Sequence, residues 1–142
     1  MDRAAEWRRL CALLDDDEAV WEAVEAALEV GDDPWDALIG GLDDAGALAY
    51  LQIDDTGMEL SDALAQLPRV FALQPDLNEV TDTDDLVEAT AAADRLLAAA
   101  GLRAIRLLEE EDAWPIAVVP ASGADDIAGL VTALGHEAVV GG

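Results

Sequence analysis

Residues 101–120, GLRAIRLLEEEDAWPIAVVP, predict a β-hairpin. The first strand is expected over residues 102–109, where Leu102 and Ala104 alternate with Arg103. The charged residues Glu110–Asp112 form the expected turn, and WPIAVVP at residues 114–120 is the expected returning strand. Two strands joined by a short turn pair in antiparallel fashion, so the sequence predicts an antiparallel sheet.

The segments on either side of this hairpin alternate between helix and strand. Downstream, SGADDIAGLVTALG at residues 122–135 has the spacing of a helix that ends at Gly135, and Ser122 with Asp125 resembles a capping box. A short final strand, EAVV, follows. Upstream, Thr83-Asp84-Asp85 opens the clearest helix of the chain, which Gly101 ends. We therefore expect each hairpin strand to be connected to a helix.

The middle of the chain holds one further predicted strand, LAYLQI at residues 48–53, which ends at the turn sequence Asp54-Asp55-Thr56-Gly57. A short helix is expected over residues 58–67. Residues 68–82 are expected to be irregular, since Pro68 and Pro75 interrupt any long element.

The first third of the chain predicts three helices. Apolar residues recur at helical spacing in each of them. Aspartates precede the second and third helices, where a carboxylate accepts the free N–H groups of the first turn. The apolar positions are Trp7, Leu10, Cys11 and Leu14, then Val20, Trp21, Val24 and Leu28, then Trp35, Leu38, Ile39 and Leu42.

Taken together, these elements predict an α+β fold with an N-terminal helical segment (residues 1–46) and an α+β sheet domain (residues 47–142), forming one compact unit. From residue 47 onward, the order matches a ferredoxin-like βαββαβ antiparallel sheet layer if the helix at 58–67 is an insertion. Right-handed crossovers would place both main helices on one face of the sheet. The N-terminal helices would cover an edge or the other face.

A resemblance to a known family adds to this interpretation. GLRAIRLLEEEDAWPIAVVP and the following SGADDIAGLVTALG resemble the C-terminal part of a bacterial family of domains of unknown function, mainly over residues 94–135. The segment GLDDAGALAYLQIDD at residues 41–55 is similar to an earlier strand of that family. The resemblance implies a bacterial source and names no activity.

The charge of the chain is extreme: 32 acidic residues stand against seven basic ones, all Arg, for a net charge of −25. A hydrophobic fraction of 53% excludes an acidic disordered chain. The acids are spread along the chain and would repel a nucleic-acid backbone, so no nucleic-acid partner is expected. No apolar run is long enough to cross a membrane. The single cysteine, Cys11, and the absence of a signal peptide predict a cytoplasmic protein.

Pairs of aspartates are the first candidates for a functional site. Most of them lie at predicted helix starts, where capping explains them. Asp54 and Asp55 follow a strand directly, and with the turn at residues 109–112 they could supply oxygen ligands to a divalent cation. A turn without a site is the competing and favoured interpretation of this pair.

Two further sets of side chains have a structural and a functional interpretation. Cys11 and His136 could form a nucleophilic dyad, but an apolar setting predicts an inert thiol. Trp35 and Trp114 could be exposed anchors for a partner, whereas the apolar residues around them favour a place in the core.

The function that the sequence favours is therefore an acidic protein-interaction or immunity-like domain without a cofactor, whose partner is a basic protein. The candidate contact residues are Trp35, Asp54, Asp55, Glu110, Asp112 and Trp114. Two alternatives stay open: a small-molecule or metal-dependent enzyme that uses these carboxylates, and an acidity that serves only salt adaptation or solubility. The sequence leaves the oligomeric state undecided.

Overall fold

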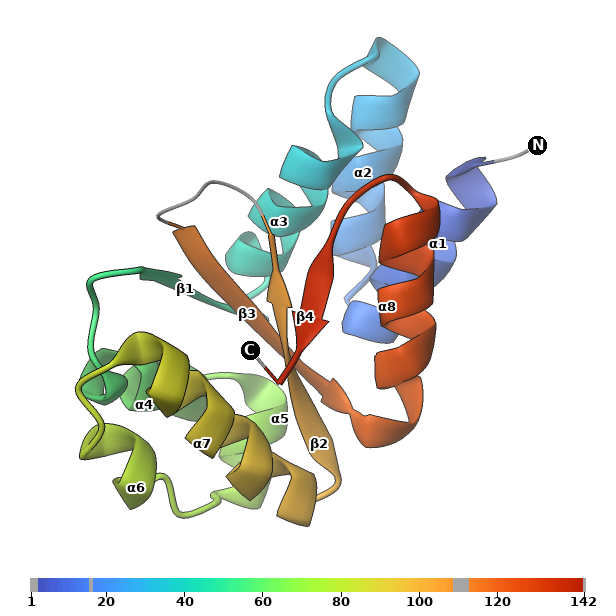
Figure 1. Ribbon diagram of the computed structural model, residues 1–142. Helices are drawn as coiled ribbons and strands as arrows, with labels where there is room; N and C mark the ends of the chain where they lie inside the picture. Colours follow the sequence, from blue (N-terminus) through green and yellow to red (C-terminus); the bar gives the residue numbers. More distant parts are fainter. Residues whose placement is uncertain (1–2, 16, 109–112, 142) are drawn as a thin grey trace.

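A four-stranded antiparallel sheet lies between two layers of helices in the computed structural model, which describes residues 3–15, 17–108 and 113–141 (Figure 1). The strands follow the order β1-β3-β2-β4 across the sheet. Their bounds are Leu48–Gln52 for β1, Leu102–Leu107 for β2, Ala113–Pro120 for β3 and Ala138–Val140 for β4. The predicted α+β class and the central hairpin are confirmed, with β2 paired to β3 from Leu102 opposite Pro120 onward.

The helices divide between the two faces of the sheet (Figure 1). One face packs against α1 (Arg3–Leu14), α2 (Glu18–Val30), α3 (Pro34–Asp44) and α8 (Ala124–Ala133). The other packs against α4 (Gly57–Ala65), α5 (Pro68–Leu73), α6 (Asn78–Thr81) and α7 (Leu86–Ala99). A 3-10 turn, η1 (Ala121–Gly123), precedes α8. The N-terminal helices thus cover one face of the sheet, which was one of the two expected positions.

Strand β3 contributes to the cores on both faces of the sheet, and this explains its nearly continuous apolar sequence. Ala117 and Val119 belong to the core under α1–α3 and α8, whereas Trp114, Ile116 and Val118 belong to the core under α4–α7. Successive side chains of a strand point to opposite faces, so a strand covered on both sides is apolar at both sets of positions.

The ferredoxin-like arrangement is not confirmed. The first three strands have the ferredoxin-like neighbours, because β3 lies between β1 and β2, but β4 pairs with β2 through Ile105 opposite Val140. In a ferredoxin-like sheet, the fourth strand lies beside the first. The expectation that both main helices share one face is also wrong, since α7 and α8 lie on opposite faces.

The position of β4 and the position of α8 have one common cause. The connections from β1 to β2 and from β3 to β4 both step two places in the same direction across the sheet. Strand β3 runs antiparallel to β1, so the second connection starts from a strand of reversed direction. If both connections have the same hand, reversing the strand direction moves the connecting helix to the opposite face. A fourth strand beside β2 therefore requires α8 opposite α7.

The predicted helix starts are confirmed where aspartates cap them. The side-chain oxygens of Asp17, Asp33 and Asp85 accept main-chain N–H groups two residues later, each at 3.0 Å. The capping box predicted at Ser122 is wrong, because Ser122 lies in η1 and Gly123 stands at the N-cap of α8 without a side-chain hydrogen bond.

Residues 68–82, expected to be irregular, contain α5 and α6. Pro68 is the first residue of α5, where proline needs no N–H partner and starts a helix instead of breaking one. No helix in the described part of the chain is long and apolar enough to cross a membrane.

Candidate functional site

The Asp54-Asp55 turn has the geometry of a structural turn. Asp55 accepts the N–H of Gln52 on its side chain at 2.8 Å and donates its own N–H to the carbonyl of Gln52 at 2.9 Å. Asp54 is exposed. Glu110 and Asp112 lie outside the described residues, so their position relative to this turn is not defined. Within residues 3–15, 17–108 and 113–141, no three Asp, Glu, His or Cys side chains are placed to hold a metal ion.

The two tryptophans that were candidate anchors are both buried, Trp35 at 3% and Trp114 at 4% exposure. The indole N–H of Trp35 donates to the carbonyl of Leu108 at 3.0 Å, and that of Trp114 donates to the hydroxyl of Thr90 at 3.0 Å. Their polar atoms are satisfied inside the fold. Both side chains therefore have the core role and offer no exposed surface to a partner.

Cys11 is a buried residue of the core and has no nucleophilic character. Burial raises the pKa of its thiol to about 12, so the thiol stays protonated at neutral pH. His136 packs against aromatic rings, with its imidazole stacked on Trp35 and in a T-shaped contact with Trp7. The structure thus gives His136 a packing role and Cys11 an inert one.

Arg106 has an unusual environment on the α4–α7 face of the sheet. Its guanidinium lies 3.9 Å from the centroid of the Trp114 ring, which is a cation–π contact. Its Nε atom is buried and has no hydrogen-bond partner within the described residues. Burial lowers the pKa of Arg106, yet a guanidinium stays charged at neutral pH. We interpret this residue as part of the packing around Trp114.

Helix α2 carries a regular row of acidic side chains. Its glutamates occupy the spacing i, i+4, i+7 and i+11, which places them in one row along the helix. All of them are exposed. We call this set the α2 acidic row: Glu18, Glu22, Glu25 and Glu29. No Arg, Lys or His occurs in the sequence between Arg9 and Arg69, so α2 and α3 contain no cation of their own.

An open groove lies on the side of α2 that faces α1. It has a volume of about 460 Å³, and its lining includes Trp21, three glutamates of the α2 acidic row and a single cation, Arg8. Asp15 and Asp17 also line it, but both accept main-chain N–H groups of the α1–α2 turn. The carboxylates free to meet a ligand in this α1–α2 groove are therefore Glu18, Glu22 and Glu25.

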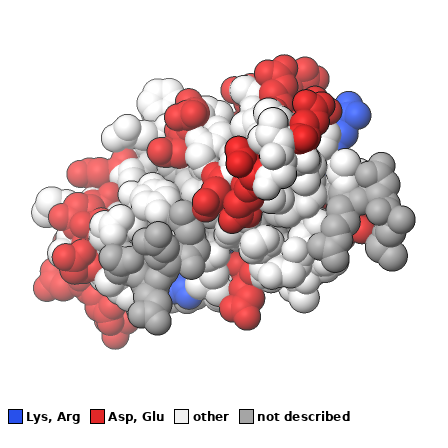
Figure 2. Space-filling model, turned by 90° about the horizontal axis from the view of Figure 1, so that it is seen from above, with Lys and Arg blue, Asp and Glu red and all other residues white. Residues whose placement is uncertain are grey.

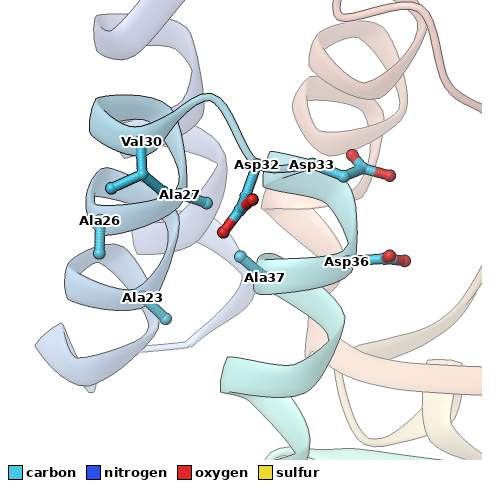
Figure 3. Close-up of a pocket in the computed structure, with 8 residues that line it drawn as sticks. All are labelled: Ala23, Ala26, Ala27, Val30, Asp32, Asp33, Asp36 and Ala37. Carbon is cyan, nitrogen blue, oxygen red and sulfur yellow. The ribbon is translucent and has the colours of Figure 1, made fainter.

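A second depression, of about 560 Å³, lies between α2 and α3 (Figure 3). Helix α2 contributes small apolar side chains, and the 71%-exposed Val30 stands at its end. Figure 3 shows the carboxylate of Asp32 between the two helices, whereas Asp33 and Asp36 point away from α2. Asp33 is also occupied in capping α3. This depression thus offers one carboxylate on an alanine-rich wall.

The wider surface is acidic but not uniformly so (Figure 2). Seen from above, Asp and Glu form separate groups divided by uncharged surface, and little Arg is visible. Several of the basic residues elsewhere are engaged: Arg103 with Asp94, Arg95 with Glu79 and Arg9 with Asp126. None of these three ion pairs involves a glutamate of the α2 acidic row.

The α2 acidic row was not among the residues predicted from the sequence, although a signal for it exists. Glutamates at four-three-four spacing, without the Lys or Arg that usually alternates with them on an exposed helix, define one charged stripe. Of the predicted contact residues, Trp35 and Trp114 lie in the core, and Asp55 lies in a turn.

Comparisons with known proteins give one match. A family model with the description "Domain of unknown function (DUF6630)" matches residues 5–141. No curated protein and no solved structure gives a significant match.

Proposed function

We propose that this chain, which belongs to the DUF6630 family of domains of unknown function, is a protein-interaction domain that binds a basic partner protein. The observation that supports the proposal most is the α2 acidic row. Like charges three and four residues apart on a helix destabilise it by about 0.2–0.5 kcal/mol per pair. A basic partner would neutralise this repulsion. Relief of the repulsion would then contribute to the free energy of binding.

The charge of the whole molecule supports the same proposal. A net charge of −25 attracts basic proteins over distances of about one Debye length, roughly 8 Å at physiological ionic strength. Complementary charge accelerates encounter and discriminates against acidic competitors. It also repels a second copy of the chain and any nucleic-acid backbone.

An immunity or inhibitory protein is the concrete form of this function that we propose. Such a protein would cover a basic surface of its target, and its carboxylates would supply specificity and a fast association rate. The proposal includes a bacterial source and a cytoplasmic location. The unpaired, buried thiol of Cys11 supports a reducing compartment.

Affinity capture tests the proposal. The immobilised protein is incubated with a bacterial lysate at about 50 mM and about 150 mM salt, beside an unrelated acidic protein of similar net charge. We expect a basic protein that is retained at both salt concentrations by this domain and not by the acidic control. Retention of the same proteins by both baits, or of no basic protein, would contradict the proposed function.

A further inference from the structure

We infer that the α1–α2 groove is the docking surface for a basic helix of the partner, whose cationic side chains align with the α2 acidic row. This inference rests on the proposed function and adds its location and its binding mode. The groove is open, three carboxylates of the row and the indole of Trp21 line it, and all glutamates of the row are exposed.

The spacing of the carboxylates favours a helix over an extended segment. From Glu18 to Glu29 the row rises by roughly 16 Å, at about 1.5 Å per residue. A partner helix with cations at i, i+4, i+7 and i+11 repeats this spacing. Four side chains on one face of an extended strand would span roughly 20 Å, at about 3.3 Å per residue, and would fall out of step with the row.

The lining of the groove provides contacts besides charge. Trp21 is half-buried in the wall, and its ring can accept an Arg guanidinium by a cation–π contact. Cys11 and Ala12 supply an apolar floor from α1. A helix laid in this groove would therefore place arginines on the glutamates of α2 and small apolar residues against α1.

Arg8 makes the two sides of the groove differ in charge. It is the only cation among the lining residues and lies on α1, across the groove from the carboxylates of α2. A basic helix would place its cations toward α2 and away from Arg8. Removing Arg8 should consequently strengthen binding, whereas removing glutamates should weaken it. General attraction predicts the same two signs, so a variant with the same change of net charge on the opposite helical layer is needed to separate a defined docking geometry from it.

A titration with synthetic peptides tests the inference. The probe is a helical peptide of about 16 residues with Arg at i, i+4, i+7 and i+11. Its control is a scrambled peptide of equal composition. The test protein has the α2 acidic row neutralised (Glu18→Gln, Glu22→Gln, Glu25→Gln and Glu29→Gln). A matched control has the same change of net charge on the opposite helical layer (Asp62→Asn, Asp82→Asn, Asp84→Asn and Glu88→Gln).

We expect the row variant to lose affinity for the helical peptide by at least about tenfold, because several exposed ion pairs are removed together. The matched control should lose less than about threefold, Arg8→Gln should gain affinity, and the scrambled peptide should bind more weakly than the helical one. Equal losses in the two charge variants would overturn the inference. Wild-type protein that fails to bind the peptide would overturn it too, while a basic protein retained in the lysate experiment would leave the proposed function intact.

Discussion

The imidazole of His136 lies flat on the indole of Trp35, with ring centroids 4.5 Å apart and an angle of 6° between the planes. Trp7 meets the same imidazole edge-on at 6.0 Å, and the N–H of Trp35 donates to the carbonyl of Leu108. These contacts join α1, α3 and the segment before β4 to the end of β2. The cluster therefore attaches the N-terminal helices, including the layer that contains α2, to the sheet.

Replacing His136 should weaken this attachment. We expect His136→Ala to lower the free energy of unfolding by about 0.5–1.5 kcal/mol, the contribution of a stacked aromatic pair beyond simple burial. His136→Phe preserves the stack and should cost clearly less. Urea unfolding of both variants measures the difference, and an equal loss in the two would show that stacking is not the source of stability.

The buried hydrogen bond between Thr90 and Trp114 gives a second prediction. Thr90→Val keeps the shape of the side chain but leaves the indole N–H without an acceptor, which costs about 1–3 kcal/mol. In a Trp114→Phe background, there is no indole N–H that could lose its acceptor. Thr90→Val should therefore lower the free energy of unfolding by less in that background. A double-mutant cycle by chemical unfolding measures this coupling. A cost for Thr90→Val that is equal in both backgrounds would contradict the role of the bond.

Asp94 and Arg103 should contribute unequally to the free energy of unfolding, although they form one ion pair. Arg103 donates to Asp94 from Nε at 2.9 Å and from Nη2 at 3.0 Å, and this hydrogen bonding raises the pKa of Arg103. Asp94 also accepts the main-chain N–H of Ala104 at 2.9 Å. Arg103→Ala should cost at most about 1 kcal/mol, because the pair is partly exposed.

Asp94→Ala should cost more than Arg103→Ala, since it removes the ion pair and also leaves the N–H of Ala104 without its acceptor. Thermal unfolding of the two variants ranks them directly. The opposite order would contradict a stabilising role for the bond between Asp94 and the main chain of Ala104.

The hydrogen bonds of Glu59 at the start of α4 predict that the stability of the protein depends on pH. The N–H and the hydroxyl of Thr56 both donate to its carboxylate, and these bonds lower the pKa of Glu59 below its ordinary value. A lowered pKa in the folded state stabilises the protein above the ordinary pKa of the group, and this contribution is lost as the pH falls through the folded-state value.

The variant Glu59→Gln keeps a side chain able to complete the capping box but removes the titration. Its free energy of unfolding should therefore fall less steeply than that of the wild type as the pH drops below about 4.5. Parallel curves for the two proteins in this range would contradict the assignment.

Much of the helical structure could be predicted because its signals are local. The caps at Asp17, Asp33 and Asp85 depend only on neighbouring N–H groups, and the apolar stripe of Trp7, Leu10, Cys11 and Leu14 is buried as its spacing indicates. Pro68 was misjudged because the same residue ends a helix when it lies inside one and starts a helix at its first position.

The strand order could not be derived in the same way. Residues 138–140 have a strand pattern that fits either edge of the sheet, and the choice depends on which face receives α8. That choice depends in turn on Ile127 and Val131, which pack against the N-terminal helices on their face of the sheet. The position of the two candidate tryptophans was open for a related reason: a tryptophan in an apolar stretch has the same local sequence whether it is exposed or, like Trp35, in the core.

Neutralising the α2 acidic row should stabilise the free protein while it weakens binding. The row contains three like-charged neighbours at i+3 or i+4, each destabilising by about 0.2–0.5 kcal/mol at low salt. The four-glutamine variant should therefore melt at a higher temperature than the wild type, and added salt should raise its melting temperature less. An unchanged or lower melting temperature at low salt would show that the row is not under repulsion.

Hydrogen–deuterium exchange tests directly whether the basic partner binds on α2. Exchange is measured for the wild-type protein alone and with the basic partner retained in the lysate experiment. We expect new protection over α2, residues Glu18–Val30, and over the facing turns of α1, with little change in α4–α7. Protection centred on α4–α7, with exchange in α2 unchanged, would contradict it.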